Sequence, residues 1–365
     1  MAVRIHYFKS DPPNFGDELN VLVWPALIPE LRATDQDIVL VGIGSILDDT
    51  VPADGPVVVL GTGAGLAPLP SGLHDGSIRV LALRGPLTAA LAGLPRDLAI
   101  TDSAILLRAI YPGLVRTRES RGKGPILFMP HFSTVNDAGW QRACARAGIE
   151  MVDPRDPCKA VLRKIASARL VIAEAMHGAI VADAFGVPWV PVASTRHFST
   201  FKWVDWALSL SVPFKPLILP AVSIRHACKR AWLGMMADRL LAEEMNLEAV
   251  DHRDPFPPAV VRLLEETRRR LAMPAKPIGM RIRLKAAALY NRVVDPLAGW
   301  AGERVLASVN ERLEIKVADV LLKAVATGGY RSDDEISAKR LMALQKKVRA
   351  FRESLRGTAA RVAVV

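Results

Sequence analysis

The chain has 365 residues, half of them hydrophobic, which suffices for the buried cores of two α/β domains. Its three cysteines are too few and too widely spaced for a disulfide framework or a zinc site, so we expect no bound metal. The sequence has neither an apolar run of membrane-spanning length nor the features of a signal peptide, which favours a cytoplasmic protein. Most of the net charge of +11 belongs to residues 216–365, with 27 Lys and Arg against 17 Asp and Glu. Because no recognised nucleic-acid-binding motif accompanies this charge, we expect no nucleic-acid partner.

Short apolar runs alternate with helical patterns over the first 110 residues. We expect strands at 3–8, 38–42, 57–60, 79–84 and 98–101, and helices at 17–27, 86–92 and 103–110. Continuous rather than alternating apolar runs are typical of parallel strands that helices cover on both faces. The charged, glycine-containing stretch 111–124 interrupts this pattern and is interpreted as a linker.

A second set of alternating elements follows the linker. Strands are expected at 126–129, 150–153, 170–175 and 189–193, and helices at 140–147, 159–168 and 178–185. The fold class is therefore α/β, with two doubly wound Rossmann-like units at 1–118 and 125–215. Ligands of such sheets bind beyond the carboxyl ends of the strands. Beyond about residue 220 the strands stop, and 220–365 is expected to be a basic helical extension.

Three glycine-containing loops directly follow predicted strands. They contain Asn14, Gly16 and Asp17 in the first loop, Gly44 and Ser45 in the second, and Gly61 and Gly63 in the third. Glycine lets the backbone approach a phosphate or carboxylate closely, and the N-terminus of a helix favours an anion. Ordinary helix caps and turns would explain the same residues without a ligand.

Charged and titratable residues lie at later strand ends. Arg84 ends a predicted strand, where its guanidinium could hold an anion in the cleft or pair on the surface with Asp102. His177 and Gly178 lie where a buried strand meets a helix, which favours an imidazole facing the cleft over a structural histidine. Candidates that lie after the next strand are the cations Arg196 and Lys202, and the tryptophans Trp203 and Trp206, which would stack on a sugar or belong to the core.

Together these segments resemble the polysaccharide pyruvyl transferases, and most closely the exopolysaccharide ketal-pyruvate transferases of the succinoglycan type. The matching segments are 14–17, 42–45, 61–65, 83–88, 101–104, 129–131 and 173–190, in the right order over roughly residues 3–210. The resemblance implies a two-domain fold like that of GT-B glycosyltransferases. It also implies phosphoenolpyruvate as the donor substrate, a sugar as the acceptor and no cofactor.

The chemistry of such a transfer assigns roles to the candidates. Arg84, with Arg196 and Lys202 behind it, would bind the donor's carboxylate and phosphate. His177 would deliver a proton to C3, and Asp17 would act as base or hold its loop. Some members of the family carry an arginine two residues before the matching histidine. Here that position is Ala175, so Arg196 and Lys202 are the candidates to supply the charge.

Two other functions and a location remain open. The shared fold also suits a glycosyltransferase that uses a sugar nucleotide, and basic C-terminal helices would suit a non-enzymatic adaptor at a membrane surface. Apolar stripes at helical spacing run through 282–293 and 341–355 with cations beside them. These stripes would pack on the α/β body, form the seam of a homodimer, or dock on the inner membrane next to a lipid-linked oligosaccharide acceptor.

Overall fold

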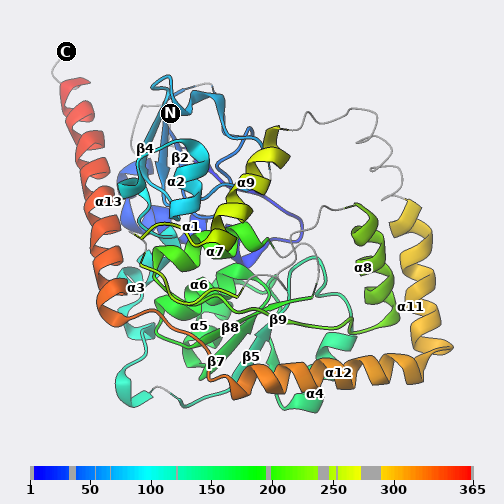
Figure 1. The fold of residues 1–365 in the computed structure, drawn as a ribbon. Helices are drawn as coiled ribbons and strands as arrows, with labels where there is room; N and C mark the ends of the chain where they lie inside the picture. Colours follow the sequence, from blue (N-terminus) through cyan, green and yellow to red (C-terminus); the bar gives the residue numbers. More distant parts are fainter. Residues whose placement is uncertain are drawn as a thin grey trace.

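The computed structural model describes residues 4–362 apart from 33–37, 54, 66, 121, 195–198, 237–245, 252–253 and 273–288. Its first sheet has four parallel strands in the order β1-β2-β3-β4 (Figure 1). The strands are β1 (Arg4–His6), β2 (Val39–Val41), β3 (Val57–Leu60) and β4 (Ile78–Ala82). Strands β2 and β3 are buried along their whole length, as their continuous apolar sequence predicts.

The second sheet has five parallel strands in the order β6-β5-β7-β8-β9. The strands are β5 (Ile126–Met129), β6 (Glu150–Met151), β7 (Leu170–Ala173), β8 (Trp189–Ala193) and β9 (Leu217–Ile218). The chain places β6 on one side of β5 and then reverses to place β7, β8 and β9 on the other side. This sheet is therefore doubly wound, with its switch point between β5 and β7. The expectation of a doubly wound first unit is wrong, because the strand order of the first sheet never reverses.

Helices cover the sheets or pack against other helices. They are α1 (Phe15–Leu27), α2 (Pro86–Ala92), α3 (Leu107–Ile110), α4 (Gly139–Ala147), α5 (Cys158–Ser167), α6 (Met176–Ala184), α7 (Thr200–Ser209), α8 (Ile224–Met236), α9 (Pro258–Ala272), α11 (Asp295–Arg304), α12 (Ala307–Ala326) and α13 (Asp334–Val362). Helix α2 begins with Pro86, whose missing N–H costs nothing in the first turn, and ends at Gly93, which has a φ of 64°.

Two predicted elements differ in the structure. The predicted helix 103–110 is a 3₁₀ turn, η4 (Ser103–Leu106), that continues into the short helix α3. Asp102 precedes η4 and accepts a hydrogen bond from the backbone of Ala104, which satisfies a donor of the tight first turn. The predicted strand at 98–101 is reduced to an isolated parallel bridge between Leu83 and Ala99.

The two sheet units are joined by buried contacts. The backbone N–H of Phe15, at the start of α1, donates to the carbonyl of Pro154 in the second unit, with an N–O distance of 2.7 Å. Helix α6 is buried from Gly178 to Ala184 and contacts both η4 of the first unit and the strands β7 and β8. The carboxyl ends of both sheets therefore border a common space.

The C-terminal helices pack back onto the body. Helix α12 lies against α4, and α13 returns to the first unit, where it contacts β3, β4, η1 (Pro29–Arg32) and η4 (Figure 1). The apolar stripe of α13 is buried at Leu344, Val348, Phe351 and Leu355. For this helix the expectation of packing on the α/β body is confirmed. Most of the other stripe, 282–288, lies outside the described residues.

No helix among the described residues is both long enough and apolar enough to cross a lipid bilayer.

Candidate active site

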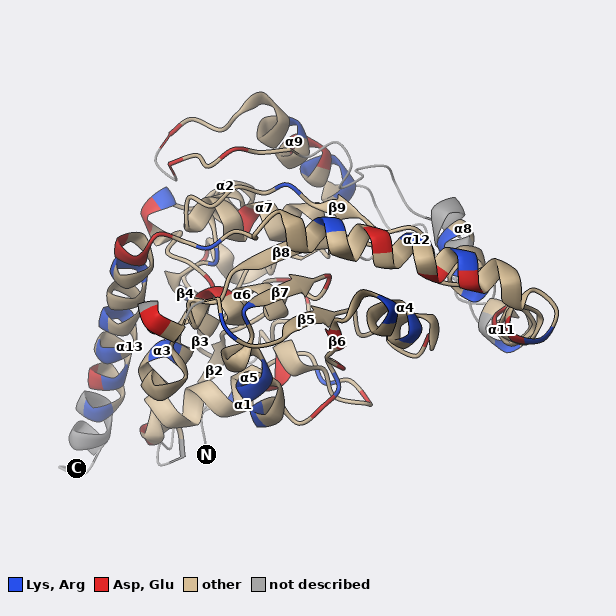
Figure 2. Cartoon of the chain, turned by 90° about the horizontal axis from the view of Figure 1, so that it is seen from below, with Lys and Arg blue, Asp and Glu red and all other residues tan. Residues whose placement is uncertain are grey.

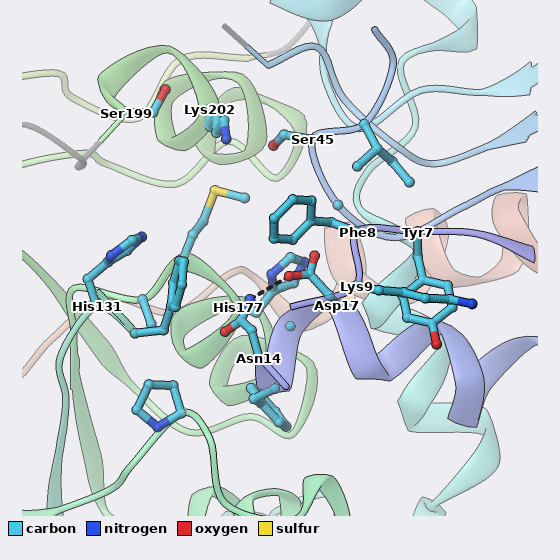
Figure 3. Close-up of a pocket in the computed structure, with 18 of the residues that line it drawn as sticks. Tyr7, Phe8, Lys9, Asn14, Asp17, Ser45, His131, His177, Ser199 and Lys202 are labelled. Atoms are coloured by element: carbon cyan, nitrogen blue, oxygen red, sulfur yellow. Dashed lines mark hydrogen bonds between the residues drawn. The ribbon is translucent and has the colours of Figure 1, made fainter. Parts of the chain in front are cut away.

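A cavity of about 550 Å³ opens between the carboxyl ends of the two sheets (Figure 3). It is bordered by the loops after β1 and β2 of the first sheet, by the loops after β5 and β7 of the second, and by α7. The β5 and β7 loops flank the switch point, where α/β sheets bind ligands. The polar side chains of the wall are His6, Tyr7, Lys9, Asn14, Asp17, Ser45, Asp48, Thr50, His131, Glu174, His177, Ser199 and Lys202.

His177 stands in the wall at the second residue of α6. It is held there by the first turn of α1, because a Cβ atom built on Gly16 would lie 2.2 Å from His177 Nδ1. Gly16 is therefore needed for the close approach of α1 to the imidazole, and the sequence signal of the first glycine loop has a packing cause. Only 13% of the His177 side chain is exposed, so the ring contacts solvent through the cavity alone.

A buried carboxyl lies behind His177. The distance from His177 Nε2 to Asp102 Oδ2 is 3.9 Å, and among the described residues neither atom has a hydrogen-bond partner. Burial, together with the positive charges of Arg84 and Lys202, lowers the pKa of His177 to about 3. Burial raises the pKa of Asp102 to about 6. The imidazole is therefore neutral at neutral pH in the unliganded protein.

Asp17 and Lys202 form the charged part of the wall. Asp17 Oδ2 accepts a hydrogen bond of 2.7 Å from Asn14 Nδ2 (Figure 3). Burial raises the pKa of Asp17 to about 6, although Asn14 and Lys202 oppose the shift. Burial and the charge of Arg84 lower the pKa of Lys202 to about 8, although Asp17 opposes the shift. Lys202 is therefore mostly protonated at neutral pH, in a place where an anion would stabilise its charge.

Arg84 does not line the cavity. The expectation that its guanidinium points into the cleft mouth is wrong, and so is the surface pairing with Asp102, because the side chain is fully buried. Arg84 Nε is 3.1 Å from Asp205 Oδ2, Nη2 donates to the carbonyl of Ala64, and Nη1 donates to Ser45 Oγ. Ser45 does line the cavity, so Arg84 lies directly behind the wall and acts on it by charge and through Ser45.

The predicted residues other than Arg84 divide into four groups. Asn14, Gly16, Asp17, Gly44, Ser45, His177 and Lys202 line the cavity together. Gly61, Gly63 and Gly178 do not line it; they allow close packing against Ser103, Arg84 and Met129, respectively. Arg196 lies outside the described residues. The tryptophans Trp203 and Trp206 are buried and pack with Trp189, which fits the structural alternative, and Trp203 also borders the cavity.

Several lining residues were not among the predicted site residues, and Lys9 and His131 are two of them. Lys9 follows β1 and His131 follows β5, and both contribute to the wall. The rule that ligands bind at the carboxyl ends of parallel strands, applied to these two strands, would have found both. The backbone N–H of His131 donates to Glu174, whose buried carboxylate also accepts from Ser194 and so fixes two loops of the wall.

Comparison with known proteins gives the family. A profile of the family described as polysaccharide pyruvyl transferase matches residues 50–196. The succinoglycan biosynthesis protein ExoV of Rhizobium meliloti (strain 1021) is 34% identical over 254 residues, which are 68% of this chain and 79% of that protein. No solved structure matches the chain significantly. On this likeness, the chain belongs to the polysaccharide pyruvyl transferase family and is a transferase.

Proposed function

We propose that this transferase moves the enolpyruvyl unit of phosphoenolpyruvate onto a sugar of an exopolysaccharide repeat unit, where it becomes a pyruvate ketal. Support comes from the family and from the relative in succinoglycan biosynthesis. The observation that carries the proposal is one cavity in which a lysine, an aspartate of raised pKa and a buried imidazole share the wall. An anionic donor and a hydroxyl nucleophile need these groups.

In this proposal the donor's charge binds at Lys202. Phosphoenolpyruvate carries a carboxylate and a phosphate, and the wall offers the ammonium groups of Lys202 and Lys9. The wall has Ala175 where some relatives carry an arginine, and Lys202 supplies a positive charge to the same cavity. Arg84 adds long-range attraction from behind Ser45.

The reaction requires two additions at C2 of the donor. One sugar hydroxyl adds to C2 and loses its proton while C3 gains a proton, so that the methylene becomes a methyl group. A second hydroxyl then forms the other C2–O bond while the bond from C2 to the phosphate oxygen breaks. Inorganic phosphate leaves with the electron pair of that bond and takes up the proton that the second hydroxyl loses. We assign Asp17 as the base on the sugar hydroxyl, since a pKa of about 6 leaves it mostly ionised yet able to accept a proton at neutral pH.

His177 is assigned as the group that delivers the proton to C3. In the unliganded protein burial, together with the charges of Arg84 and Lys202, holds its pKa near 3, too low for a proton donor. Bound donor would bring negative charge next to these cations and so raise the pKa of His177. Asp102 would stabilise the resulting imidazolium from 3.9 Å away. Donor binding would in this way activate the proton donor.

The acceptor is inferred to be a lipid-linked oligosaccharide that enters the open side of the cavity. The two parallel sheets that face each other across this cavity fit a GT-B-like arrangement, in which donor and acceptor meet between two units. No cofactor takes part in the proposed steps. The neutral sugar ring would bind mostly through hydrogen bonds to polar wall residues such as Asn14, Ser199 and Thr50.

The test is to incubate the purified chain with phosphoenolpyruvate and lipid-linked oligosaccharide, and to measure phosphate release together with a ketal methyl signal in the NMR spectrum of the product. A Lys202→Gln variant should raise KM for the donor at least about tenfold. The matched control is Lys346→Gln, which changes an exposed lysine of α13 and should leave KM for the donor unchanged. Binding of sugar nucleotides without any binding of phosphoenolpyruvate would refute the proposal and favour a glycosyltransferase.

A further inference from the structure

Helix α11 and the turn before it present an apolar face that no described part of the chain covers. Val293 in η8 (Tyr290–Val294), and Leu297 and Trp300 in α11, are exposed by 42%, 59% and 59%. These three residues and Arg304 are spaced i, i+4, i+7 and i+11, so they share one side of the helix. Trp300 differs in this from the other tryptophans whose burial the structure describes, since Trp24, Trp140, Trp189, Trp203 and Trp206 are all buried.

The opposite side of α11 attaches the helix to the body. Ala298 and Gly302 are buried there, and Asp295 pairs with Arg225 of α8 with an Nε–Oδ1 distance of 2.9 Å. The apolar residues of the outer side are therefore not held in place by the core. Helix α11 itself runs beside α8 at the end of the molecule opposite to α13 (Figures 1 and 2).

The charged residues of α11 and of the turn before it are also divided between the two sides. Its acidic residues face the body, where Asp295 pairs with Arg225 and Glu303 pairs with Arg142. The cations Arg292 and Arg304 are exposed and stand beside or within the apolar face. In the sequence, the segment 276–292 that precedes α11 contains basic residues and no acidic ones. An apolar face with a tryptophan and a basic edge complements an anionic lipid surface.

We propose that the outer face of α11, formed by Val293, Leu297, Trp300 and Arg304, docks on the surface of an anionic membrane. The helix would lie in the plane of the interface, with Leu297 and Trp300 among the acyl chains and with Arg292 and Arg304 at the lipid phosphates. The packed stripe of α13 takes no part, because its apolar residues are buried against the first sheet unit. This inference concerns a surface outside the cavity and does not depend on the donor chemistry.

The experiment is flotation of the full chain with phosphatidylcholine vesicles of rising phosphatidylglycerol content, at low and high salt. The wild-type chain should bind anionic vesicles at low salt. The double variant Leu297→Ser/Trp300→Ser should bind at least about tenfold more weakly and keep its thermal midpoint, because both side chains are exposed. The matched control is Leu322→Ser/Met342→Ser, which removes two exposed apolar residues of α12 and α13 and should bind like the wild type.

Two further readouts identify the contact. Arg292→Gln/Arg304→Gln should reduce both the affinity and its salt dependence. Binding to vesicles should shift the tryptophan emission of the wild-type chain to shorter wavelength. The variant Trp300→Phe should still bind vesicles but should no longer show this shift. Absence of wild-type binding to anionic vesicles at low salt, or an equal loss in the control pair, would overturn the proposal. The proposal would also be overturned if the wild-type chain formed a dimer and did not bind vesicles, and if Leu297→Ser/Trp300→Ser converted that dimer to monomers. The face would then be a dimer interface.

Discussion

His177 and Asp102 face each other inside the protein, with His177 Nε2 and Asp102 Oδ2 3.9 Å apart. The two residues come from different sheet units, since Asp102 precedes η4 of the first and His177 begins α6 of the second. A movement of about 1 Å would turn this contact into a hydrogen bond, and catalytic hydrogen bonds are often long before substrate binds. The distance between the two units thus determines how strongly Asp102 stabilises a protonated His177.

Asp102→Asn tests this coupling. The asparagine keeps an acceptor for the backbone N–H of Ala104 but loses the negative charge that would stabilise an imidazolium. We expect kcat to fall about 10–100-fold with little change in KM for the donor, because the charge acts on the proton step.

The matched control is Asp183→Asn, another buried carboxylate, which accepts hydrogen bonds from Trp189 and from the backbone and hydroxyl of Ser332. This control should lower the thermal midpoint and leave kcat unchanged. If Asp102→Asn keeps full turnover while its own thermal midpoint falls, Asp102 serves only as a cap.

Gly16→Ala tests the packing that places the imidazole. The new methyl group would lie 2.2 Å from His177 Nδ1, so the ring must move. Turnover should fall at least about tenfold, because small displacements of a catalytic group are costly. The control is Gly113→Ala, whose methyl group would meet no atom within 4 Å and should have no effect. Steady-state kinetics and the thermal midpoint of both variants decide the matter, and full activity of Gly16→Ala would contradict the placement.

The pH dependence of donor kcat/KM should be bell-shaped. The acidic limb should lie near pH 6, where Asp17 and Asp102 ionise, and the alkaline limb near pH 8, where Lys202 loses its proton. Lys202→Arg should move the alkaline limb upward, because a guanidinium stays protonated. An alkaline limb that remains near pH 8 in this variant would exclude Lys202 as its source.

The same groups predict how stability depends on pH. Asp17 and Asp102 have pKa values near 6 in the folded chain and lower values when unfolded, so the folded state binds their protons more tightly. Their contribution to stability is therefore fully present below the unfolded pKa and is lost as the pH rises through about 6. Thermal midpoints measured from pH 4 to 8 should show a smaller loss across this range in Asp102→Asn than in the wild type. An identical loss would show that Asp102 does not titrate there.

Arg84 is expected to matter for folding first. Arg84→Met leaves Asp205 as a buried carboxylate without its cation, which should cost about 3–5 kcal/mol of unfolding free energy. The double variant Arg84→Met/Asp205→Leu should recover part of this loss, although Thr88 then loses its acceptor. Urea unfolding of the wild type, the single variants Arg84→Met and Asp205→Leu, and the double variant measures the coupling. Simple additivity of the two single changes would rule out a stabilising pair.

The sequence predicted the loops of the cavity well and the directions of side chains less well. Most strands and helices occur where the apolar runs place them, and the strand-end rule brought Asp17, Ser45 and His177 to one wall. Arg84 also ends a strand, but its side chain points inward, where it pairs with Asp205. No local pattern indicates this partner, because Asp205 lies 121 residues further along the chain. The sequence also did not predict the lowered pKa of His177, because the shift depends on burial and on the charges of Arg84 and Lys202, which lie elsewhere in the sequence. Such effects arise from tertiary contacts that no local pattern records.

The return of α13 to the first unit has a consequence for synthesis on the ribosome. Strands β3 and β4 are complete early, but the helix that covers this side is made from the last part of the chain, with Leu344, Val348 and Phe351 as its buried contacts. Until then the growing chain carries an uncovered apolar surface through the translation of more than two hundred residues. We expect the first unit to be a client of chaperones during synthesis and to become independent of them only when the final helix has docked.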